Sequence, residues 1–521
     1  MRGTRWPGAT TTGATTADAT TCGTTAREGD RSGTAPGART GVVLCRPGHV
    51  LDLELGLEPD AEPDAEPDAE PDVEPDRGPD RGPDRVPGLE ADAEADAGPA
   101  ADPGPARLRT PDGKDATGAS GRALALVRLH GHPLGLVGAT ADAPGALLPA
   151  LTEAARRELA VPIGRHLAAD RTRPANGHGP RAPRTSARVL HPCLAARADT
   201  LLDAPLISVV VCTHDRAGML RDCLDSVLRV DYPRFEVVVV DNAPHSEAAA
   251  RLVRERYQGR VRYLREPIAG LARARNRGLA VAAGQLIAYV DDDIVVDRAW
   301  LAAIAEAFAG SRRTGCVTGL ILPVELVTDA QAAVVRHADF DKGFARRRWS
   351  LADPPPDPLF PFTAGRFGSG GNMAIRADLL RALGGFDLAT GPGTPARGGE
   401  DLLAFFRVLA AGRELVYQPD AVVWHRHRRT EEALAVQAFG YGSGLGAYLT
   451  AAALHEPRLL PALLRRLPRG VALALGRARA RPAADEAWSW RLSRLELQGL
   501  LYGPLGYLAA VHRAYRDNRR G

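Results

Sequence analysis

The sequence predicts an α/β protein with a mostly parallel sheet and helices on both of its faces. Two observations carry this prediction. Between about residues 206 and 430, short apolar runs alternate with stretches whose apolar residues recur at the spacing of one helix face. Most of these apolar runs are continuous or nearly so rather than alternating with polar residues, which indicates strands that are buried on both faces, as in parallel sheets.

The first 121 residues are predicted to form a disordered, low-complexity acidic tail. A tetrapeptide array runs from Glu58 to Arg85 with proline at every fourth position, and proline removes helix donors. The segment 52–96 carries 18 acidic residues against 3 arginines, a net charge of −15 in a chain whose overall charge is +3. This concentration of like charge opposes collapse into a core.

A small α+β subdomain is predicted for residues 122–170. Apolar runs on both sides of Gly131 indicate a hairpin, and residues 147–168 have the pattern of one or two helices. Residues 171–205 begin with a stretch rich in proline and arginine, and we expect this segment to be a linker.

Residues 206–430 are predicted to form one catalytic domain, whose first half alternates regularly between strand and helix. Strands are expected at 207–212, 235–240, 261–264 and 286–290. Helices are expected at 219–230, 246–257 and 272–283. This order of elements is typical of a parallel sheet with crossover helices.

Residues 431–521 are predicted to form a helical, basic extension. The stretch 433–454 contains no charged residue and is long enough to span a bilayer, but its glycines and polar residues favour a buried or interfacial helix. Beyond it, arginines alternate with leucine clusters. Two interpretations stay open for this part: a surface that contacts anionic lipid, and a solvated face that packs on the preceding domain.

Composition and motifs indicate the compartment of the protein and the classes of partner that it is expected to bind. Six cysteines occur without a CxxC pair, which favours free thiols in a reducing compartment. The first residues show no apolar stretch typical of a secretory signal, so we expect a cytoplasmic protein. No helix-turn-helix, zinc-finger or RNA-binding motif occurs in the sequence, and nucleic acid is therefore not an expected partner.

Three consecutive aspartates, Asp291 to Asp293, follow the predicted strand 286–290. Ligand sites of open α/β sheets lie outside the carboxyl ends of the strands. Three adjacent carboxylates repel one another unless a cation or a ligand compensates them, and Mg²⁺ and Mn²⁺ bind oxygen ligands and bridge to phosphates. The alternative is a solvated acidic turn or a helix cap.

Six further motifs surround the triplet. They are Ser208–Arg216, Val237–Asn242, Gly270–Gly278, Gly368–Arg376, Gly398–Leu402 and Val422–Arg429. Their order resembles glycosyltransferase family 2, the inverting nucleotide-sugar enzymes with the GT-A fold, over about residues 206–430. The resemblance implies a GT-A type, Rossmann-like sheet and a nucleoside-diphosphate sugar as donor.

The resemblance also implies a donor site. Six residues are expected to bind the nucleotide sugar: Thr213, Asp215, Asp241, Arg275, Asn276 and Asp291. A carboxylate such as Asp241 can accept from N–H groups of a base, and the Arg275 guanidinium matches phosphate oxygens. Asp293 is implied as a ligand of a divalent cation, Mn²⁺ or Mg²⁺, and His425 as a further ligand, with His427 as the alternative.

On the acceptor side, the resemblance implies that Asp401 is the catalytic base and that Glu400 assists it or contacts the acceptor. Both acids precede a predicted helix at 402–411, so favourable electrostatics at a helix start is the structural alternative. Glycine permits close backbone approach. The pocket for the sugar and the acceptor is expected to be lined by Gly370, Gly371 and Asn372.

The expected function is metal-dependent transfer of a sugar from a nucleoside diphosphate to an acceptor hydroxyl, with inversion, in synthesis of bacterial cell-envelope polysaccharide or glycolipid. The acceptor would be a glycan or lipid-linked, and the basic C-terminal helices would give peripheral contact with the inner face of the plasma membrane. Two alternatives are a non-catalytic module that binds a glycan or nucleotide, and a sugar-phosphate nucleotidyltransferase. The second requires a glycine-rich, basic phosphate loop after the first strand, which Cys212–Arg216 lacks.

Overall fold

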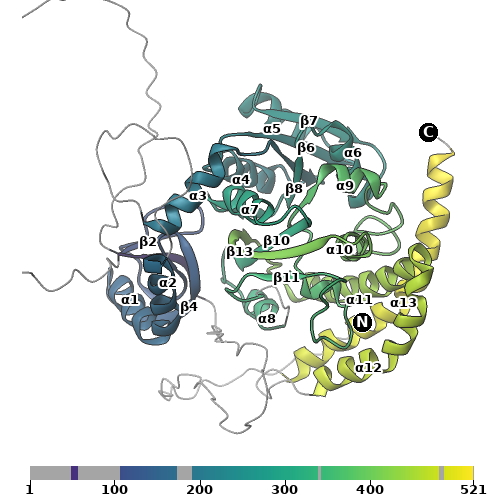
Figure 1. The fold of residues 1–521 in the computed structure, drawn as a ribbon. Coiled ribbons are helices and arrows are strands. Elements are labelled where there is room, and N and C mark those ends of the chain that lie inside the picture. The colour runs from purple at the N-terminus through teal and green to yellow at the C-terminus, as the bar shows by residue number, and fades with distance from the viewer. Residues whose placement is uncertain (1–47, 57–105, 173–190, 338–341, 480–485, 520–521) are drawn as a thin grey trace, which may run out of the picture. The chain divides into compact units, whose positions relative to one another are not determined.

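A computed structural model describes residues 48–56, 106–172, 191–337, 342–479 and 486–519 (Figure 1). The described chain is organised around two sheets, one of nine strands and one of four. The tetrapeptide array and most of the predicted acidic tail lie outside the described residues, as do residues 173–190 of the predicted linker.

The larger sheet has the strand order β11-β13-β10-β12-β8-β5-β6-β7, and β9 pairs with β13. Its strands are β5 Ile207–Thr213, β6 Phe235–Asn242, β7 Val261–Glu266, β8 Leu286–Asp291, β9 Ile294–Val296, β10 Thr314–Pro323, β11 Arg347–Trp349, β12 Asn372–Arg376 and β13 Glu414–His425. Six of these nine strands run in one direction, and β9, β11 and β12 run in the other. The sheet with its flanking helices confirms the predicted α/β fold class (Figure 1).

Helices cover both faces of this sheet because successive strand residues point to opposite sides. In β5, Val209 and Val211 join the apolar cluster that contains Trp300, whereas Val210 joins the cluster that contains Phe405. The helices are α4 Ala217–Val227, α5 Ala248–Arg256, α6 Leu271–Val281, α7 Trp300–Ala309, α8 Asp329–His337, α9 Ala377–Ala382 and α10 Glu400–Ala410, with a 3₁₀ turn, η1, at Ala364–Arg366. Trp300 therefore places α7 on one face, and Phe405 places α10 on the other.

Strand register brings polar residues to one edge of the sheet. Thr213 at the end of β5 pairs with Asp241 in β6, and Cys212 pairs with Asp291, the last residue of β8. His425 ends β13, which runs parallel to β10. Because these strands share one direction, their carboxyl ends lie at the same edge, where such sheets bind ligands.

The smaller sheet has the order β2-β1-β3-β4. Its strands are β1 His49–Leu55, β2 Arg107–Arg109, β3 Gly121–Leu129 and β4 His132–Ala141, and they are followed by α1 Leu147–Glu158 and α2 Ala160–Thr172. Leu147 and Leu151 of α1 are buried in the same apolar cluster as β1 and β3. The hairpin expected around Gly131 is the antiparallel pair β3–β4.

The prediction of a disordered tail through residue 121 is wrong for two segments. Residues 49–55 form β1, which pairs in parallel with β3, and residues 107–109 form β2, which pairs with β1. Apolar residues alternate with polar ones along β1, and the apolar set is buried. This alternation marks a half-buried strand, and the strongly acidic composition around it concealed the pattern.

Buried ion pairs connect the smaller sheet to the larger one. Arg128 in β3 lies 2.8 Å from Asp52 and 2.8 Å from Asp297, which precedes α7. Asp420 in β13 accepts from Arg197 of α3 (Pro192–Leu202) at 2.7 Å, and its carboxylate lies 2.6 Å from Nδ1 of His132. These side chains are largely buried, so removal of one partner would leave a poorly solvated charge, which makes each pair costly to break.

The C-terminal helices are α11 Glu431–His455, α12 Leu460–Arg479 and α13 Glu486–Asn518, with a 3₁₀ turn, η2, at Pro457–Leu459. Helices α11 and α13 lie side by side in Figure 1 and approach closely through glycines. A Cβ atom on Gly442 would lie 1.8 Å from the backbone oxygen of Glu496, so only glycine fits. Of the helices in the described ranges, none has the length and apolar character needed to cross a membrane.

Candidate active site

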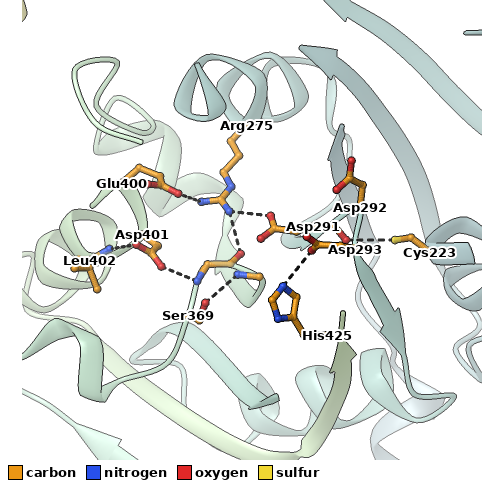
Figure 2. Close-up of polar contacts among 12 residues, drawn as sticks. Cys223, Arg275, Asp291, Asp292, Asp293, Ser369, Glu400, Asp401, Leu402 and His425 are labelled. Atoms are coloured by element: carbon orange, nitrogen blue, oxygen red, sulfur yellow. Dashed lines mark hydrogen bonds and ion pairs between the residues drawn. The ribbon is translucent and has the colours of Figure 1, made fainter. Parts of the chain in front are cut away.

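The aspartate triplet spans the end of β8 and the turn that leads into β9. Asp292 and Asp293 are buried, and about a third of the Asp291 side chain is exposed. The three carboxylates point in different directions (Figure 2). Each one therefore has its own partners and its own chemical character.

Asp292 ties the triplet to the loop after β5. Its Oδ2 accepts a hydrogen bond from Thr213 Oγ1 at 2.7 Å, and its Oδ1 accepts from Arg216 at 3.2 Å. In Figure 2 its carboxylate is turned away from those of Asp291 and Asp293. Burial and the neighbouring Asp293 raise the pKa of Asp292 to about 6. Asp292 thus anchors the backbone that carries Asp291 and Asp293. Thr213 is connected to the site through its hydrogen bond to Asp292.

Asp293 is surrounded by basic groups. His425 Nε2 lies 3.3 Å from its Oδ1, and the guanidinium groups of Arg216 and Arg428 lie 3.2 and 3.9 Å from its Oδ2. Burial opposes ionisation of this carboxyl, but His425 and the two arginines outweigh it and hold the pKa of Asp293 well below its usual range. Asp293 is therefore ionised at neutral pH, as a cation ligand must be.

His425 and His427 form a pair at the end of β13, with their Nδ1 atoms 3.0 Å apart. Burial, followed by repulsion from His425, lowers the pKa of His427 to about 3, so this ring is neutral at pH 7. His425 directs its other nitrogen, Nε2, at Asp293 (Figure 2). Neighbouring ligands of an octahedral cation lie about 3 Å apart, which the 3.3 Å between Nε2 and Asp293 Oδ1 approaches. The donor set fits Mn²⁺ or Mg²⁺.

Arg275 links the triplet to the start of α10. Its Nη1 donates to Glu400 Oε1 at 3.1 Å, and its Nη2 donates to Asp291 Oδ1 at 3.3 Å and to the carbonyl oxygen of Gly370 at 3.2 Å. The side chain is 2% exposed. This guanidinium compensates two acids inside the protein, and it does not lie open to a diphosphate as the sequence led us to expect.

Glu400 and Asp401 open helix α10 directly after Gly399, whose φ of 90° favours glycine. Asp401 Oδ2 accepts a hydrogen bond from the backbone N–H of Gly370 at 2.8 Å, and Glu400 is held by Arg275. Burial and the neighbouring Asp401 raise the pKa of Glu400 to about 7, although Arg275 opposes this rise. The two acids therefore have different environments.

Gly370 and Gly371 separate the acids of α10 from the triplet. A Cβ on Gly370 would lie 2.8 Å from Cβ of Asp401, and one on Gly371 would lie 3.1 Å from Oδ2 of Asp291. Gly370 therefore needs glycine, whereas a side chain at Gly371 would require Asp291 and Ile294 to shift. Asn372 differs, because its amide donates to the carbonyl oxygen of Ala421 and its Oδ1 accepts from the indole of Trp300. The side chain of Asn372 therefore lies in the core beneath the site and does not line the expected pocket.

Asp241 lies at the neighbouring strand end and is fully buried. Its Oδ2 accepts from the hydroxyl of Tyr263 at 2.8 Å, whereas its Oδ1 has no hydrogen-bond partner among the described residues. Burial raises the pKa of this carboxyl. A buried oxygen without a partner is costly, so Asp241 carries one unused acceptor at this strand end.

Two further predicted donor residues have partners within the protein. Asp215, with φ 53°, accepts from the backbone N–H of His245 at 3.1 Å and lies 2.6 Å from Nδ1 of the same histidine. Asn276 exchanges two hydrogen bonds, both of 2.8 Å, with the backbone of Phe386. Asn276 therefore connects α6 to the loop after α9, while Asp215 lies at the rim between the ends of β5 and β6.

The structure gathers most of the predicted residues around one strip of backbone. Asp291, Asp293 and His425 lie on one side of the two glycines, and Glu400 and Asp401 lie on the other (Figure 2). Sequence reasoning did not assign Arg216 or Tyr263 a role. Arg216 is the last residue of the motif Ser208–Arg216, after the first strand of the domain. Its positive charge could have suggested that it lies close to the acidic triplet. No sequence pattern pointed to Tyr263, because only the pairing of β6 with β7 brings it close to Asp241.

Residues 208–384 match the model of Glycosyl transferase family 2. This segment belongs to that family. The match confirms the predicted family and contains the triplet and the two glycines, while Glu400, Asp401 and His425 lie beyond its end. The alternating strands and helices described above are the fold expected for a family 2 domain.

Curated relatives of the family 2 domain include glycosyltransferases from animals and bacteria. The chain is 28% identical over 247 residues to polypeptide N-acetylgalactosaminyltransferase 5 of Caenorhabditis elegans, which covers 43% of this chain and 37% of the relative. It is 27% identical over 175 residues to the pre-mycofactocin glycosyltransferase of Mycobacterium tuberculosis, covering 33% of this chain and 34% of the relative. The chain thus spans little more than a third of the length of these two relatives.

Solved structures that resemble the chain include two glycosyltransferase complexes. One is the mannosyltransferase PcManGT from Pyrobaculum calidifontis with GDP-Man and Mn²⁺, with 22% identity, a TM-score of 0.36, and coverage of 62% of this chain and 94% of that chain. The other is GalNAc-T7 with UDP, GalNAc and Mn²⁺, with 19% identity, a TM-score of 0.33, and coverage of 46% and 50%.

Proposed function

We propose that the protein is a metal-dependent inverting glycosyltransferase that moves a sugar from a nucleoside diphosphate to an acceptor hydroxyl. The observation that carries this proposal is the division of the acidic residues by Gly370 and Gly371. Asp293 with His425 lies on one side, and Asp401 lies on the other. Inversion by a single displacement needs this separation, with a leaving-group site opposite a base.

On the donor side, we assign Asp293 and His425 to the divalent cation, Mn²⁺ or Mg²⁺. When bound, such a cation neutralises the charge that grows on a departing diphosphate. Asp291 is free on one oxygen to contact the ribose, since Arg275 is bonded to Oδ1. The buried Oδ1 of Asp241, which has no hydrogen-bond partner among the described residues, would accept from the base, and Arg216 and Arg428 supply positive charge beside the cation.

On the acceptor side, we assign the base to Asp401. Its carboxylate is oriented by the N–H of Gly370 at 2.8 Å and that of Leu402 at 2.8 Å, which leaves lone pairs for an acceptor hydroxyl. Glu400 accepts a hydrogen bond from Arg275, and its protonation state determines the charge next to Asp401. Cell-envelope polysaccharide or glycolipid is the acceptor class that we propose.

A donor-hydrolysis and transfer screen of nucleotide sugars, with Mn²⁺ or Mg²⁺ and with chelator, tests this function. Asp293→Asn and Asp401→Asn should each lower kcat by about 100-fold or more, because each removes a role in the transition state. Asp231→Asn, at an exposed pair with Arg298, is the matched control and should keep full activity. Full turnover by Asp401→Asn would overturn the base assignment.

The same screen separates the alternatives. A non-catalytic module would bind nucleoside diphosphates without any turnover, and one relative, from mouse, is named an inactive N-acetylgalactosaminyltransferase-like protein. A nucleotidyltransferase would release diphosphate from a nucleoside triphosphate and a sugar phosphate. Isothermal titration with nucleoside diphosphates, with and without Mn²⁺, measures whether the protein binds the nucleotide and whether binding requires the cation.

We also propose peripheral contact with anionic lipid at the inner face of the plasma membrane. Helix α13 exposes Leu497, Leu501, Leu505 and Leu508, and this apolar stripe follows the exposed Arg494. Exchange of Leu501 and Leu505 for glutamate should abolish sedimentation with vesicles that contain phosphatidylglycerol. Leu202→Glu, at an exposed site on α3, should leave it intact. Equal sedimentation of all variants would contradict the proposal.

A further inference from the structure

Four side chains with metal-binding atoms converge in the smaller N-terminal part, away from the sugar-transfer site. They are His130, His166, Asp170 and Cys193, and one ligand atom from each lies within 4.8 Å of the others. His130 lies in the β3–β4 turn, His166 and Asp170 are four residues apart on α2, and Cys193 is in the first turn of α3. None of these residues has a role in the function proposed above.

The separations between the ligand atoms match those of a tetrahedral site. His130 Nδ1 lies 3.3 Å from His166 Nε2, 3.6 Å from Cys193 Sγ and 3.2 Å from Asp170 Oδ2, and Sγ lies 3.3 Å from the same Oδ2. With zinc bonds of about 2.0–2.1 Å to nitrogen or oxygen and about 2.3 Å to sulfur, tetrahedral edges are about 3.3–3.6 Å. Four of the six separations therefore fit one bound ion, and the other two, from His166 to Cys193 and to Asp170, are within 4.8 Å.

Local structure directs these side chains inward. His130 adopts φ 53°, a left-handed backbone conformation that residues with a side chain rarely adopt, and it is nonetheless buried. Asp170 uses its other oxygen, Oδ1, to accept from the backbone N–H of Cys193 at 2.7 Å. The ring of His191 stacks on that of His130 with centroids 3.6 Å apart and covers the cluster. The donors are therefore oriented by their surroundings, as metal ligands are.

We propose that His130, His166, Asp170 and Cys193 bind one structural Zn²⁺ ion. Two imidazoles, one carboxylate and one thiolate complete a closed tetrahedral set, with no position left for substrate. The proton that Cys193 now donates to Asp170 would pass to solvent when the thiolate binds. The exposed trio His214, Asp215 and His245 is a weaker candidate, because it is open to solvent and lacks a sulfur ligand.

The zinc would join three separate elements of the smaller N-terminal part. It ties the β3–β4 turn to α2 and α3, and α3 carries Arg197 to Asp420 of the larger sheet. Next to the site, His132 follows His130 and contacts the same Asp420. A bound ion would thereby hold the smaller sheet and α3 in one arrangement against β13.

Metal analysis of the full-length protein tests the proposal. Protein purified without chelator should retain about one zinc per chain through gel filtration, and Cys193→Ala and His166→Ala should lose it. Titration of chelator-treated protein with Co²⁺ should give tetrahedral d–d bands and a thiolate charge-transfer band. Cys193→Asp should keep the metal but lose the thiolate band, because it offers oxygen in place of sulfur.

Matched variants separate this site from the catalytic one. Cys223, whose Sγ lies 3.6 Å from the backbone oxygen of Asp291, is the thiol beside the triplet, and Cys223→Ala should keep the cobalt band. Asp293→Asn should keep the zinc. Wild-type protein that binds no zinc and shows no thiolate band with Co²⁺ would overturn the proposal, as would equal zinc in wild type and Cys193→Ala.

Discussion

At the scale of single residues, the site is set by how its buried charges are compensated. Arg275 bonds to Asp291 and Glu400 at once, while Asp293 is compensated by His425 and two arginines. Glu400 receives less compensation than its burial and its neighbour Asp401 require, so its pKa rises to about 7. The pKa values of Asp293 and Glu400 are thus shifted in opposite directions by their surroundings.

The raised pKa of Glu400 predicts a pH dependence of stability. As pH rises from its ordinary pKa of 4.5 to about 7, the unfolded chain releases this proton before the folded protein does. The free energy of unfolding therefore falls with pH across this window. Glu400→Gln cannot titrate, and it should remove about 1–3 kcal/mol of that fall. Urea unfolding at several pH values measures it.

The control for this prediction is Glu247→Gln, an exposed acid paired with Arg265. Its unfolding free energy should follow the same pH curve as that of the wild type. If Glu400→Gln also follows the wild-type curve, the charge of Glu400 is compensated more fully than its burial indicates.

At the scale of elements, glycines determine which helices and loops can approach. The strip Gly370–Gly371 lets Asp401 and Asp291 lie on either side of one backbone segment. Glycines likewise let α11 and α13 cross closely. The clustered glycines in the sequence already indicated close packing. The segment that packs against each glycine, however, depends on the three-dimensional arrangement.

Two glycines of α11 predict opposite outcomes for the same substitution. A Cβ at Gly442 would lie 1.8 Å from the backbone oxygen of Glu496, whereas a Cβ at Gly440 would lie 3.9 Å from its nearest neighbour, the backbone oxygen of Arg397. Gly442→Ala should therefore separate the helices and destabilise the protein by roughly 2–4 kcal/mol. Gly440→Ala should stabilise it by about 0.5–1 kcal/mol through helix propensity. Thermal unfolding of both variants checks this, and a shift of the same sign in both would contradict it.

At the scale of the whole molecule, Asp420 connects the two sheets. It lies in β13, and its carboxylate contacts Arg197 of α3 and His132 of β4. The compensating interactions lower its pKa in spite of burial, so it is charged at neutral pH. Loss of this charge removes the carboxylate that lies 2.7 Å from the largely buried Arg197 and leaves this arginine with the more distant Glu306, at 3.5 Å.

Asp420→Asn should therefore destabilise the protein by about 3 kcal/mol. Hydrogen exchange should show faster exchange in β3, β4 and α3 than in the β5–β8 part of the larger sheet. Asp231→Asn, at the exposed pair with Arg298, should lower the free energy of unfolding by less than about 1 kcal/mol. Uniform acceleration of exchange throughout the chain would show that the sheets unfold as one unit.

The sequence by itself determined the layers of the larger sheet and which acids lie at its strand ends. Continuous apolar runs implied strands buried on both faces, and an acid directly after such a run must lie at the strand end, as Asp241 and Asp291 do. These inferences depend only on local sequence, because the backbone period decides which side chains are buried and where a strand stops.

Only the tertiary structure decided which of these polar groups have free atoms. Arg275 and Asn276 follow the predicted motif, yet the protein itself occupies their donors and acceptors. Asp241 keeps an unused oxygen, and His130 meets Cys193 across 63 residues of chain. Hydrogen-bond saturation and metal-ligand geometry arise from contacts between segments far apart in the chain, and no local pattern of residues encodes them.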